Sequence, residues 1–439
     1  MKFYNRENEI KILKNADSHK AKRAIFTMII GRRRVGKTAL SLQATKNIKT
    51  LYFFVAKKNE ALLCEEFVLE IQSKLNIPIF GNINKFEQLF AYLLDISKTT
   101  PFTLIIDEFQ EFLKINPSIY SSIQKLWDIN KDNAKLHLIA CGSIYSLMKK
   151  IFEDQNEPLF GRLDFKIDLK PFKVNVLTEI LADYNSYSNQ NLLDFYIFTG
   201  GIAKYIELLV LYQAFDFDKI IDTIFSSNSL FLNEGKNRLI EEFGKEYGIY
   251  FSILSLIASS KTSKKEIESV LQKNISGHLY RLENDYNIIK SIKPIVAKPN
   301  SKVQKYEIVD NFLLFWFRFI YKYQSLVELE NFEKLKIIAY RDFSTFSGKL
   351  LEKLHIEILK STNKYTEIGS YWERGNLNEI DIVAIDSINK ELLICEVKIN
   401  PKKLNKQKLI LKSVNLIKNY NDYEIEYRLL SLDNLKCYH

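Results

Sequence analysis

Four residues near the amino end of the sequence have the types and spacing of a phosphate-binding loop. Gly31, Gly36, Lys37 and Thr38 fill every fixed position of the pattern GxxxxGK[ST]. The glycines let the backbone turn tightly, so that amide N–H groups can point at a polyphosphate. The lysine can then reach the terminal phosphates, and the threonine hydroxyl can hold Mg²⁺. We therefore predict a nucleoside-triphosphate site with these candidate contacts: Gly31, Arg34, Val35, Gly36, Lys37, Thr38 and Ala39.

Two neighbouring acids supply the second half of such a site. The apolar run 102–106 predicts a buried strand, and Asp107 and Glu108 follow it directly. In a site that hydrolyses a triphosphate, one acid at a strand end binds Mg²⁺ and a second orients the attacking water. We predict the metal-binding role for Asp107 and the water-polarising role for Glu108. The alternative is a strand with a polar, solvated end.

Two further polar residues could complete this site. Ser143 follows the predicted strand 136–141, which places it between the acid pair and the γ-phosphate, where it could sense hydrolysis. Arg162 lies in a loop before the predicted strand 165–169. It could stabilise charge in the transition state, either within its own chain or across a subunit boundary. A homo-oligomer is thus left open, and an exposed loop arginine is the alternative.

A second group of candidate catalytic residues lies near the carboxyl end. Two predicted strands, 379–385 and 391–398, are joined by a polar turn and form a hairpin. Asp381 lies on the first, and Glu396 and Lys398 share one face of the second. Two carboxylates can bind Mg²⁺ and activate water against a phosphodiester, while Lys398 steadies the developing charge. A solvated hairpin edge is the alternative. The predicted metal ligands of this group are three carboxylate side chains: Glu352 from a preceding helix, Asp381 and Glu396.

These residues need an α/β scaffold to bring them together. Strands and helices alternate through the first part of the chain, which predicts a parallel sheet wrapped by helices, the fold of P-loop NTPases. The pattern then turns helical, and we predict a helical lid. Three short helices and a hairpin follow in winged-helix order, and the last part is predicted to be a separate α/β domain. The predicted domains are residues 1–173, 174–245, 246–330 and 331–439.

The predicted winged helix offers side chains that could contact phosphates and groove edges. Its third helix carries His278, Tyr280 and Arg281, and its hairpin is rich in lysine. A winged helix can equally serve as an internal packing or protein-contact module, so DNA contact is one of two alternatives. The hairpin lysines are Lys293, Lys298, Lys302 and Lys305.

Composition bounds the class of protein. A hydrophobic content of 46% is enough for ordinary buried cores, and no apolar run approaches the ~20 residues of a membrane span. The four cysteines are scattered and form no CxxC pair, so neither a zinc site nor a disulfide framework is indicated. A net charge of +10 favours a polyanionic partner such as nucleic acid. We expect a cytoplasmic protein with no membrane partner.

The order of the motifs in residues 1 to about 240 resembles the archaeal-type ATPases, which belong to the wider AAA+ and signal-transduction ATPases. The resemblance implies ATP and Mg²⁺ as cofactors and places Arg6 near the adenine. Ala203 stands where the family usually has proline, so a nucleotide-sensing role of that turn is not carried over. The motifs that carry the resemblance are the segments 3–13, 31–38, 104–110, 142–143, 158–162 and 200–206.

The carboxyl-terminal D…ExK pattern resembles the PD-(D/E)XK nuclease superfamily. The whole tail also resembles an uncharacterised domain that is often fused to archaeal-type ATPases, and Trp372 and residues 379–381 match the motif style of that domain. The resemblance implies a restriction-endonuclease-like fold, in which catalysis can be lost while the fold is kept.

Three interpretations follow from these features. The first is an AAA+-like enzyme that binds and hydrolyses Mg-ATP, associates with DNA and carries a metal-dependent nuclease in its tail. The second is an ATP-controlled regulatory switch whose winged helix and tail bind DNA or protein without nuclease chemistry. A transcription regulator that binds DNA through Arg281 is a third interpretation.

Overall fold

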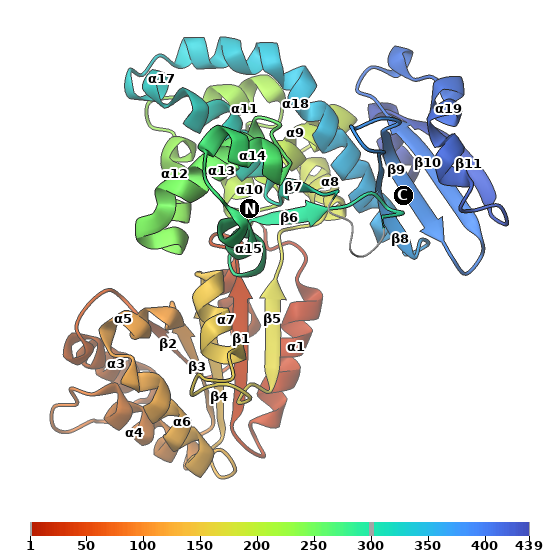
Figure 1. Ribbon diagram of the computed structural model, residues 1–439. Coiled ribbons are helices and arrows are strands. Elements are labelled where there is room, and N and C mark those ends of the chain that lie inside the picture. Colours follow the sequence, from red (N-terminus) through yellow and green to blue (C-terminus); the bar gives the residue numbers. More distant parts are fainter. Residues whose placement is uncertain (1, 298–302, 439) are drawn as a thin grey trace. The chain divides into compact units, whose positions relative to one another are not determined.

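The computed structural model describes residues 2–297 and 303–438, and these form two compact units (Figure 1). The amino-terminal unit comprises residues 4–171, and the carboxyl-terminal unit comprises residues 172–438 together with residues 2 and 3. The predicted wing residues Lys298 and Lys302 lie outside the described residues. The finer division into four domains stays a prediction.

The amino-terminal unit is built on a five-stranded parallel sheet in the order β2-β3-β4-β1-β5. Every residue of β1, β3 and β4 is buried, as expected for central strands that are covered on both faces. The parallel α/β fold predicted for this part of the chain is therefore confirmed. The strands are β1 (Ile25–Gly31), β2 (Thr50–Phe54), β3 (Phe102–Asp107), β4 (Leu136–Gly142) and β5 (Phe165–Leu169).

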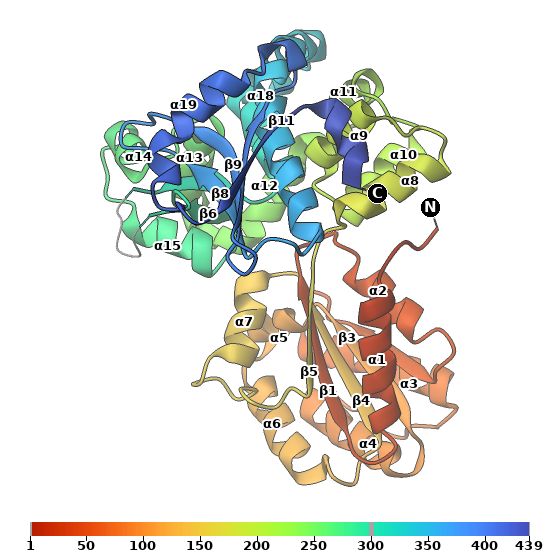
Figure 2. The same ribbon diagram turned by 90° about the vertical axis from the view of Figure 1, so that its right-hand side faces the viewer.

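Helices cover both faces of this sheet (Figures 1 and 2). Side chains alternate along β1, so Ile29 packs with Leu13 and Leu40 of the helices on one face, whereas Phe26 and Met28 pack against helices on the other. The first face is covered by α1 (Glu7–His19) and α2 (Lys37–Ala44). The second is covered by α3 (Glu60–Leu75), α4 (Phe86–Thr99), the 3₁₀ turn Phe109–Glu111 with α5 (Phe112–Ile115), α6 (Ser118–Asn130) and α7 (Tyr145–Glu153).

The carboxyl-terminal unit begins with helices packed around an aromatic core. A buried ion pair, with 2.7 Å between Arg238 Nη2 and Asp310 Oδ2, ties two of its segments together. Gly235 is needed beside Trp316, because a Cβ at this position would lie 2.3 Å from the indole ring. The helices are α8 (Val174–Asp183), α9 (Asn189–Thr199), α10 (Ala203–Leu211), α11 (Phe217–Ile224) and α12 (Leu230–Phe243), with a 3₁₀ turn at Gly244–Glu246.

Three helices and an antiparallel hairpin follow, in the order that the winged-helix prediction requires. The middle helix starts with a capping box in which Ser263 and Glu266 each accept a hydrogen bond from the backbone N–H of the other. The winged-helix assignment itself stays a prediction. The elements are α13 (Tyr247–Ala258), α14 (Lys264–Leu271), α15 (Ser276–Asn284), β6 (Ile289–Ile292) and β7 (Lys305–Ile308). Then come α16 (Asn311–Phe315), a π-helical turn (Trp316–Ile320), a 3₁₀ turn (Tyr321–Tyr323) and α17 (Gln324–Glu328).

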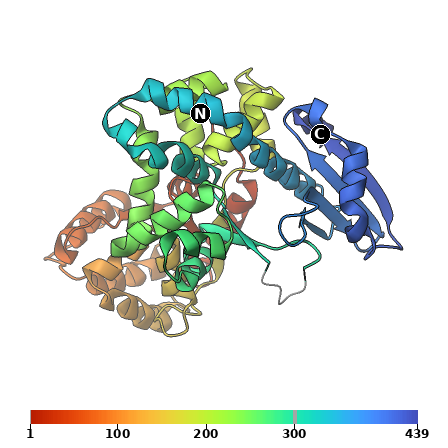
Figure 3. The same cartoon turned by 45° about the horizontal axis from the view of Figure 1, so that its top comes forward.

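The last part of the chain forms a four-stranded mixed sheet in the order β11-β10-β9-β8 (Figures 1 and 3). Strands β9 and β10 are the predicted hairpin, and β11 runs parallel to β10. Val383 and Ile394 pack against α19 on one face, and the alternate residues Ile382 and Cys395 are buried on the other, where α18 contacts the sheet. The elements are α18 (Phe332–Ser361), β8 (Glu367–Tyr371), β9 (Ile380–Asp386), β10 (Glu391–Val397), a 3₁₀ turn (Pro401–Lys403), α19 (Lys406–Ile417), β11 (Glu424–Leu430) and a 3₁₀ turn (Leu432–Tyr438).

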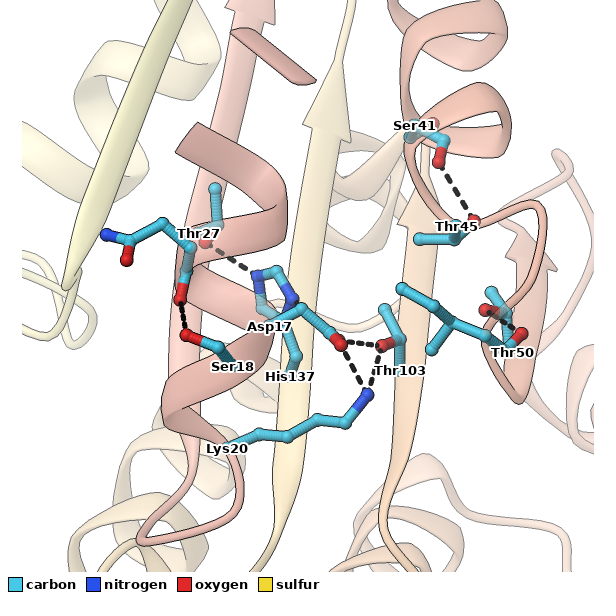
Figure 4. Close-up of polar contacts among 11 residues, drawn as sticks. Asp17, Ser18, Lys20, Thr27, Ser41, Thr45, Thr50, Thr103 and His137 are labelled. Atoms are coloured by element: carbon cyan, nitrogen blue, oxygen red, sulfur yellow. Dashed lines mark hydrogen bonds and ion pairs between the residues drawn. The ribbon is translucent and has the colours of Figure 1, made fainter. Parts of the chain in front are cut away.

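A polar network fixes α1 to the amino-terminal sheet (Figure 4). The buried ring of His137 lies 2.8 Å from Thr27 Oγ1 through Nε2 and 3.4 Å from Asp17 Oδ1 through Nδ1. Thr103 and Lys20 also donate to Asp17, each over 2.6 Å. Burial lowers the pKa of His137, because the charged ring would lose its hydration. The row of Thr27, His137 and Asp17 therefore has a structural role and not a catalytic one, since the His137 ring is only 1% exposed.

Candidate functional site

The strand order brings the predicted nucleotide-site residues to one edge of the amino-terminal sheet. Because β4 lies between β1 and β3, the carboxyl ends of these three parallel strands are neighbours. The phosphate loop follows β1 at Gly31, Glu108 follows β3, and Ser143 follows β4. Open parallel sheets bind their ligands at this edge. The structure thus groups side chains that lie more than 100 positions apart in the sequence.

The phosphate loop has the backbone geometry that its sequence predicts. Arg34 and Gly36 have φ angles of 70° and 102°, and α2 begins directly after Gly36. Because glycine has no side chain, the first N–H groups of α2 are not capped from this position and can face an anion. Lys37 Nζ donates to the carbonyls of Gly31 over 2.9 Å and Arg32 over 3.2 Å, so its ammonium lies over the loop. A Cβ at Gly31 would lie 2.6 Å from the Leu169 carbonyl oxygen.

The two predicted metal-binding side chains of this site already touch. Thr38 Oγ1 donates to Asp107 Oδ2 over 2.6 Å. Tyr52, on the neighbouring strand β2, donates to the same oxygen over 2.9 Å. Burial, and then the nearby charge of Asp107, raises the pKa of Tyr52, so the phenol stays protonated and keeps donating. Tyr52 was not among the predicted site residues, because only the strand order places it beside Asp107.

Glu108 is held in place by two neutral donors. Its backbone is left-handed, with φ of 55°, and its carboxylate accepts hydrogen bonds from Ser143 Oγ over 2.7 Å and from Gln110 Nε2. Gly142 is required here, since a Cβ would lie 2.3 Å from Met148 Sδ. Ser143 thus contacts the acid that is predicted to orient water. Gln110 was also missed, although it lies only two residues after Glu108.

Arg6 occupies a strained position at the start of α1. Its φ angle is 129°, outside the usual regions for a residue with a side chain. The guanidinium is buried and donates to the Lys170 carbonyl over 2.8 Å and to Glu9 Oε1 over 3.3 Å. Burial lowers the pKa of Arg6. These contacts join α1 to the carboxyl end of β5, and the predicted position near adenine stays a prediction.

Arg162 lies at the opposite edge of the sheet from the phosphate loop. It precedes β5, which runs parallel to β1 with Phe165 beside Thr27, so Arg162 is at the amino edge. The seven residues of β1 separate the two edges by about 20 Å. Its Nη2 pairs with Asp128 over 2.9 Å. Within this unit Arg162 therefore does not approach the phosphates, and action across a subunit boundary stays a prediction.

The amino-terminal site fits a magnesium nucleotide. Mg²⁺ prefers a few protein oxygens together with phosphate oxygens and water, and the Thr38 hydroxyl and Asp107 carboxylate supply two such oxygens side by side. The uncapped start of α2 and Lys37 supply positive ends for phosphates. Among the predicted contacts of this loop, Val35 is buried and Ala39 is exposed.

The carboxyl-terminal cluster also comes together as predicted. Asp381 Oδ2 accepts from Lys398 Nζ over 3.0 Å and from the Val397 N–H over 2.8 Å. Glu396 accepts from Lys412 Nζ over 3.1 Å and from the Asn405 N–H over 3.3 Å. Each acid is thus held by one ammonium and one backbone amide. Lys412 was not singled out for this role, because six lysines lie on or near that helix and only its packing selects one.

Glu352 joins this cluster from α18. Burial, and then the charge of Asp381, raises the pKa of Glu352 to about 8. Among residues 2–297 and 303–438, however, no three or more histidine, cysteine, aspartate or glutamate side chains are grouped to hold a metal ion. With Asp381 and Glu396 each paired to a lysine, this arrangement does not fit a divalent cation. Ligation by Glu352, Asp381 and Glu396 stays a prediction that requires the lysines to move.

The candidate DNA contacts of the middle segment have different surroundings. Arg281 is engaged within the unit, 2.9 Å from Glu246 Oε2 and 3.2 Å from the Tyr250 hydroxyl. Tyr280 is 64% exposed on the third helix, where it could meet a partner. Lys305 pairs with Glu379 over 3.1 Å. No helix in the described part of the chain is long and apolar enough to cross a membrane.

Comparisons with known proteins agree with the amino-terminal site. Residues 3–209 match a family described as an ATPase domain predominantly from Archaea, and residues 316–410 match one described as "Archaea bacterial proteins of unknown function". The Walker-type ATPase PABY2304 of Pyrococcus abyssi superposes with a TM-score of 0.56 at 20% identity, covering 72% of this chain and 96% of that one. The Aeropyrum pernix ORC2 protein, solved as ADPNP-ADP complexes, gives 0.50 at 14%, covering 77% and 96%.

One relative matches from end to end. The uncharacterized protein MJECL04 of Methanocaldococcus jannaschii is 30% identical over 447 aligned residues, covering 100% of this chain and 94% of that protein. The two solved structures establish the fold, and the matched ATPase domain contains the phosphate loop, the acid pair and Ser143. The chain therefore belongs to one family with MJECL04, and its residues 3–209 form an ATPase domain of the kind found predominantly in Archaea.

Proposed function

We propose that this chain hydrolyses Mg-ATP at the carboxyl edge of its parallel sheet and uses the cycle to control binding of nucleic acid. The observation that supports hydrolysis best is the pair of adjoining contacts at the strand ends. Thr38 donates to Asp107, and Ser143 donates to Glu108. A bound Mg²⁺ would neutralise charge on the phosphates. Thr38 and Asp107 are the residues that would hold it.

Glu108 would orient the attacking water. Its carboxylate is fixed by Ser143 and Gln110, both of which are neutral. Neutral donors orient the acid without adding a positive charge that would compete for it, so an oxygen can still accept a hydrogen bond from water. Lys37 would move its ammonium from the loop carbonyls to the phosphates, because an anion is the stronger acceptor.

Substitution of Lys37 tests the nucleotide site directly. We expect Lys37→Ala to weaken binding of a fluorescent ATP analogue in titrations with Mg²⁺ present, because the side chain that faces the phosphates is gone. Lys46→Ala is the matched control, since Lys46 is an exposed lysine just past the end of α2. Equal affinity in the two variants would argue against the site.

Nucleic acid is proposed as the partner because of charge and surface. The chain carries a net charge of +10, and its carboxyl-terminal unit presents lysines on several elements. A polyanion is the partner that such a surface recognises. The acids of the tail cluster are already paired with lysines, which favours binding without metal chemistry in this unit.

A nuclease is the second candidate function of the tail. The observation that favours it is the convergence of Asp381, Glu396 and Lys398 at the end of the β9–β10 hairpin. Cleavage of plasmid, single-stranded DNA and RNA would be followed with Mg²⁺ or Mn²⁺, comparing the wild type with Asp381→Ala. Metal-dependent cuts that disappear in Asp381→Ala would establish the nuclease. Equal cutting by both proteins would exclude this cluster as its source.

A further inference from the structure

A groove of about 1,010 Å³ opens in the carboxyl-terminal unit beside the tail cluster. Its walls come from the start of α14, from β7, from α18 and from the loop between β8 and β9. They therefore belong to both the hairpin segment and the last sheet. Most of the lining residues are polar or charged types, and they include Thr262, Ser263, Lys264, Lys265, Lys305, Lys349, Trp372 and Glu379.

Lysines from three elements line this groove. Lys264 and Lys265 come from α14, Lys305 from β7 and Lys349 from α18. Lys265 and Lys349 are exposed and make no ion pair within residues 2–297 and 303–438. Ammonium groups spaced along one groove without local partners are the arrangement that binds a polyphosphate backbone.

The acidic residues of the groove are occupied by contacts of their own. Glu266 accepts hydrogen bonds from the backbone and hydroxyl of Ser263 as part of the α14 capping box. Glu268 lies 3.6 Å from Lys264, and Glu379 pairs with Lys305. Glu268 and Glu379 are thus each paired with a lysine, whereas the contacts with Ser263 leave Glu266 charged. The lining carries four lysines against three acids, and Lys265 and Lys349 are the two of these lysines without an ion pair among the described residues.

The groove leads to the tail cluster. Lys349 precedes Glu352 by three residues on α18, so the two side chains lie on one face of the helix. Glu379, on the groove wall, is two residues before Asp381. Both Lys349 and Glu379 act electrostatically on Glu352. A chain lying in the groove would therefore reach the cluster of Glu352, Asp381 and Lys398.

We propose that this groove binds a single strand of nucleic acid along its phosphate backbone and leads it to the tail cluster. The inference rests on the proposed nucleic-acid role of the carboxyl-terminal unit. The groove has the volume of a cube with edges of about 10 Å, whereas the major groove alone of a B-form duplex is about 12 Å wide. It therefore encloses one strand and excludes a double helix.

The strand is held by its phosphates and not by its bases. Trp372 lines the groove, but its side chain is only 5% exposed, and Lys305 Nζ lies 4.5 Å from the centre of its ring. The ring face that would stack on a base is thus covered. Binding is accordingly independent of base sequence and strongly dependent on salt.

The experiment compares two double variants of the full chain that lose the same charge. Lys265→Gln/Lys349→Gln removes two groove lysines, and Lys334→Gln/Lys360→Gln removes two exposed lysines elsewhere on α18. Binding of a fluorescein-labelled oligo(dT) of about 20 nucleotides is followed by fluorescence anisotropy at several salt concentrations. We expect the groove variant to bind more weakly and its salt slope, log K against log[salt], to fall by about 1.4. The control should match the wild type.

Each outcome separates the groove from the wider proposal. If wild type binds oligo(dT) and the groove variant has the same affinity and salt slope, the strand does not bind in the groove. The nucleic-acid role of the protein would then stand. If a duplex of the same length binds more tightly than oligo(dT) and depends on the same lysines, the assignment to a single strand is wrong. If wild type binds neither, both are wrong, and ATP hydrolysis is judged separately by phosphate release.

Discussion

The two units of this protein each place two acids near strand ends, on β3 in the first and on β9 and β10 in the second, but different donors hold them. In the amino-terminal unit, hydroxyl groups of Thr38 and Tyr52 donate to Asp107, and Ser143 donates to Glu108. In the carboxyl-terminal unit, lysine ammonium groups and backbone amides hold both acids. The acids therefore accept hydrogen bonds from neutral hydroxyls in one cluster and pair with ammonium groups in the other.

The difference shows that the charge of the neighbouring donors, and not only the presence of acids, decides whether a cluster can bind a divalent cation. A carboxylate that accepts hydrogen bonds from neutral hydroxyls keeps its charge, which a divalent cation can then neutralise. A carboxylate paired with lysine has already been neutralised, and a cation must displace the ammonium before it can bind. The amino-terminal cluster is thus prepared for Mg²⁺, whereas the tail cluster is closed in this arrangement.

The largest expected difference between the two clusters is in ATP turnover after one charge is removed from each. We expect Glu108→Gln to lower the rate of phosphate release by about 10²–10⁴-fold, because water loses its proton acceptor. Asp381→Asn should leave that rate unchanged. ATP binding should persist in Glu108→Gln, since Lys37 and Thr38 are intact. Turnover that falls equally in both variants would show that the clusters do not act separately.

The same comparison predicts effects of different size on stability. Glu396 is 4% exposed and holds Lys412. Glu396→Gln should lower the free energy of unfolding by about 1–3 kcal/mol, because the partly buried ammonium of Lys412 loses its counter-ion. Asp107→Asn should change it by less than about 1 kcal/mol, since an amide oxygen can still accept from hydroxyls. Urea denaturation of both variants tests this, and a larger loss in Asp107→Asn would reverse the argument.

The sequence predicted the residues whose positions follow from local pattern. The phosphate loop needs only eight consecutive residues, and Asp107 and Glu108 need only the end of an apolar strand. Tyr52 could not be predicted, because its contact with Asp107 depends on β2 lying beside β3. The edge on which Arg162 lies could have been predicted. In a parallel sheet, the residues before a strand lie at the amino edge.

The contacts of the tail cluster were predictable only in part. Alternation along β10 places Glu396 and Lys398 on one face, and the structure agrees. The choice of Lys412 as the partner of Glu396 depends on how α19 is rotated against the sheet, which its lysine-rich sequence does not determine. The sequence thus predicted which acids converge but not whether they are neutralised, and that second property carries the functional difference.

The protonation of Glu352 in the tail cluster can be tested through the pH dependence of stability. The pKa of Glu352 is raised to about 8 by burial and by Asp381, whereas an unfolded glutamate titrates near about 4.3. Between about pH 5 and pH 8 the folded chain therefore keeps a proton that the unfolded chain releases, so stability falls as pH rises. Glu352→Gln has no proton to lose and should resist this decline.

The measurement is the melting temperature of wild type and Glu352→Gln across this pH range, with a chelator present so that no divalent cation contributes. The two curves should lie close together near pH 5 and separate toward pH 8, with the variant the more stable. Glu328→Gln is a control in a short helix of the same unit. Parallel curves for wild type and Glu352→Gln would show that Glu352 is ionised throughout.

The smallest expected effect concerns the Tyr52 hydroxyl, which the sequence did not predict as part of the site. Tyr52→Phe removes one of the two hydroxyl donors to Asp107 Oδ2 and leaves Thr38 in place. Because Thr38 still donates to the same oxygen, we expect the loss to be limited to about 1 kcal/mol, so that ATP turnover at limiting Mg²⁺ falls by about five-fold. Tyr92→Phe, on α4, controls for the loss of a phenol elsewhere in the same unit. If the hydroxyl orients Asp107 for Mg²⁺, raising the Mg²⁺ concentration should restore most of the rate. A loss that Mg²⁺ does not restore would instead mean that Tyr52 supports the sheet edge, and the carboxylate of Asp107 would then owe its position to Thr38 alone.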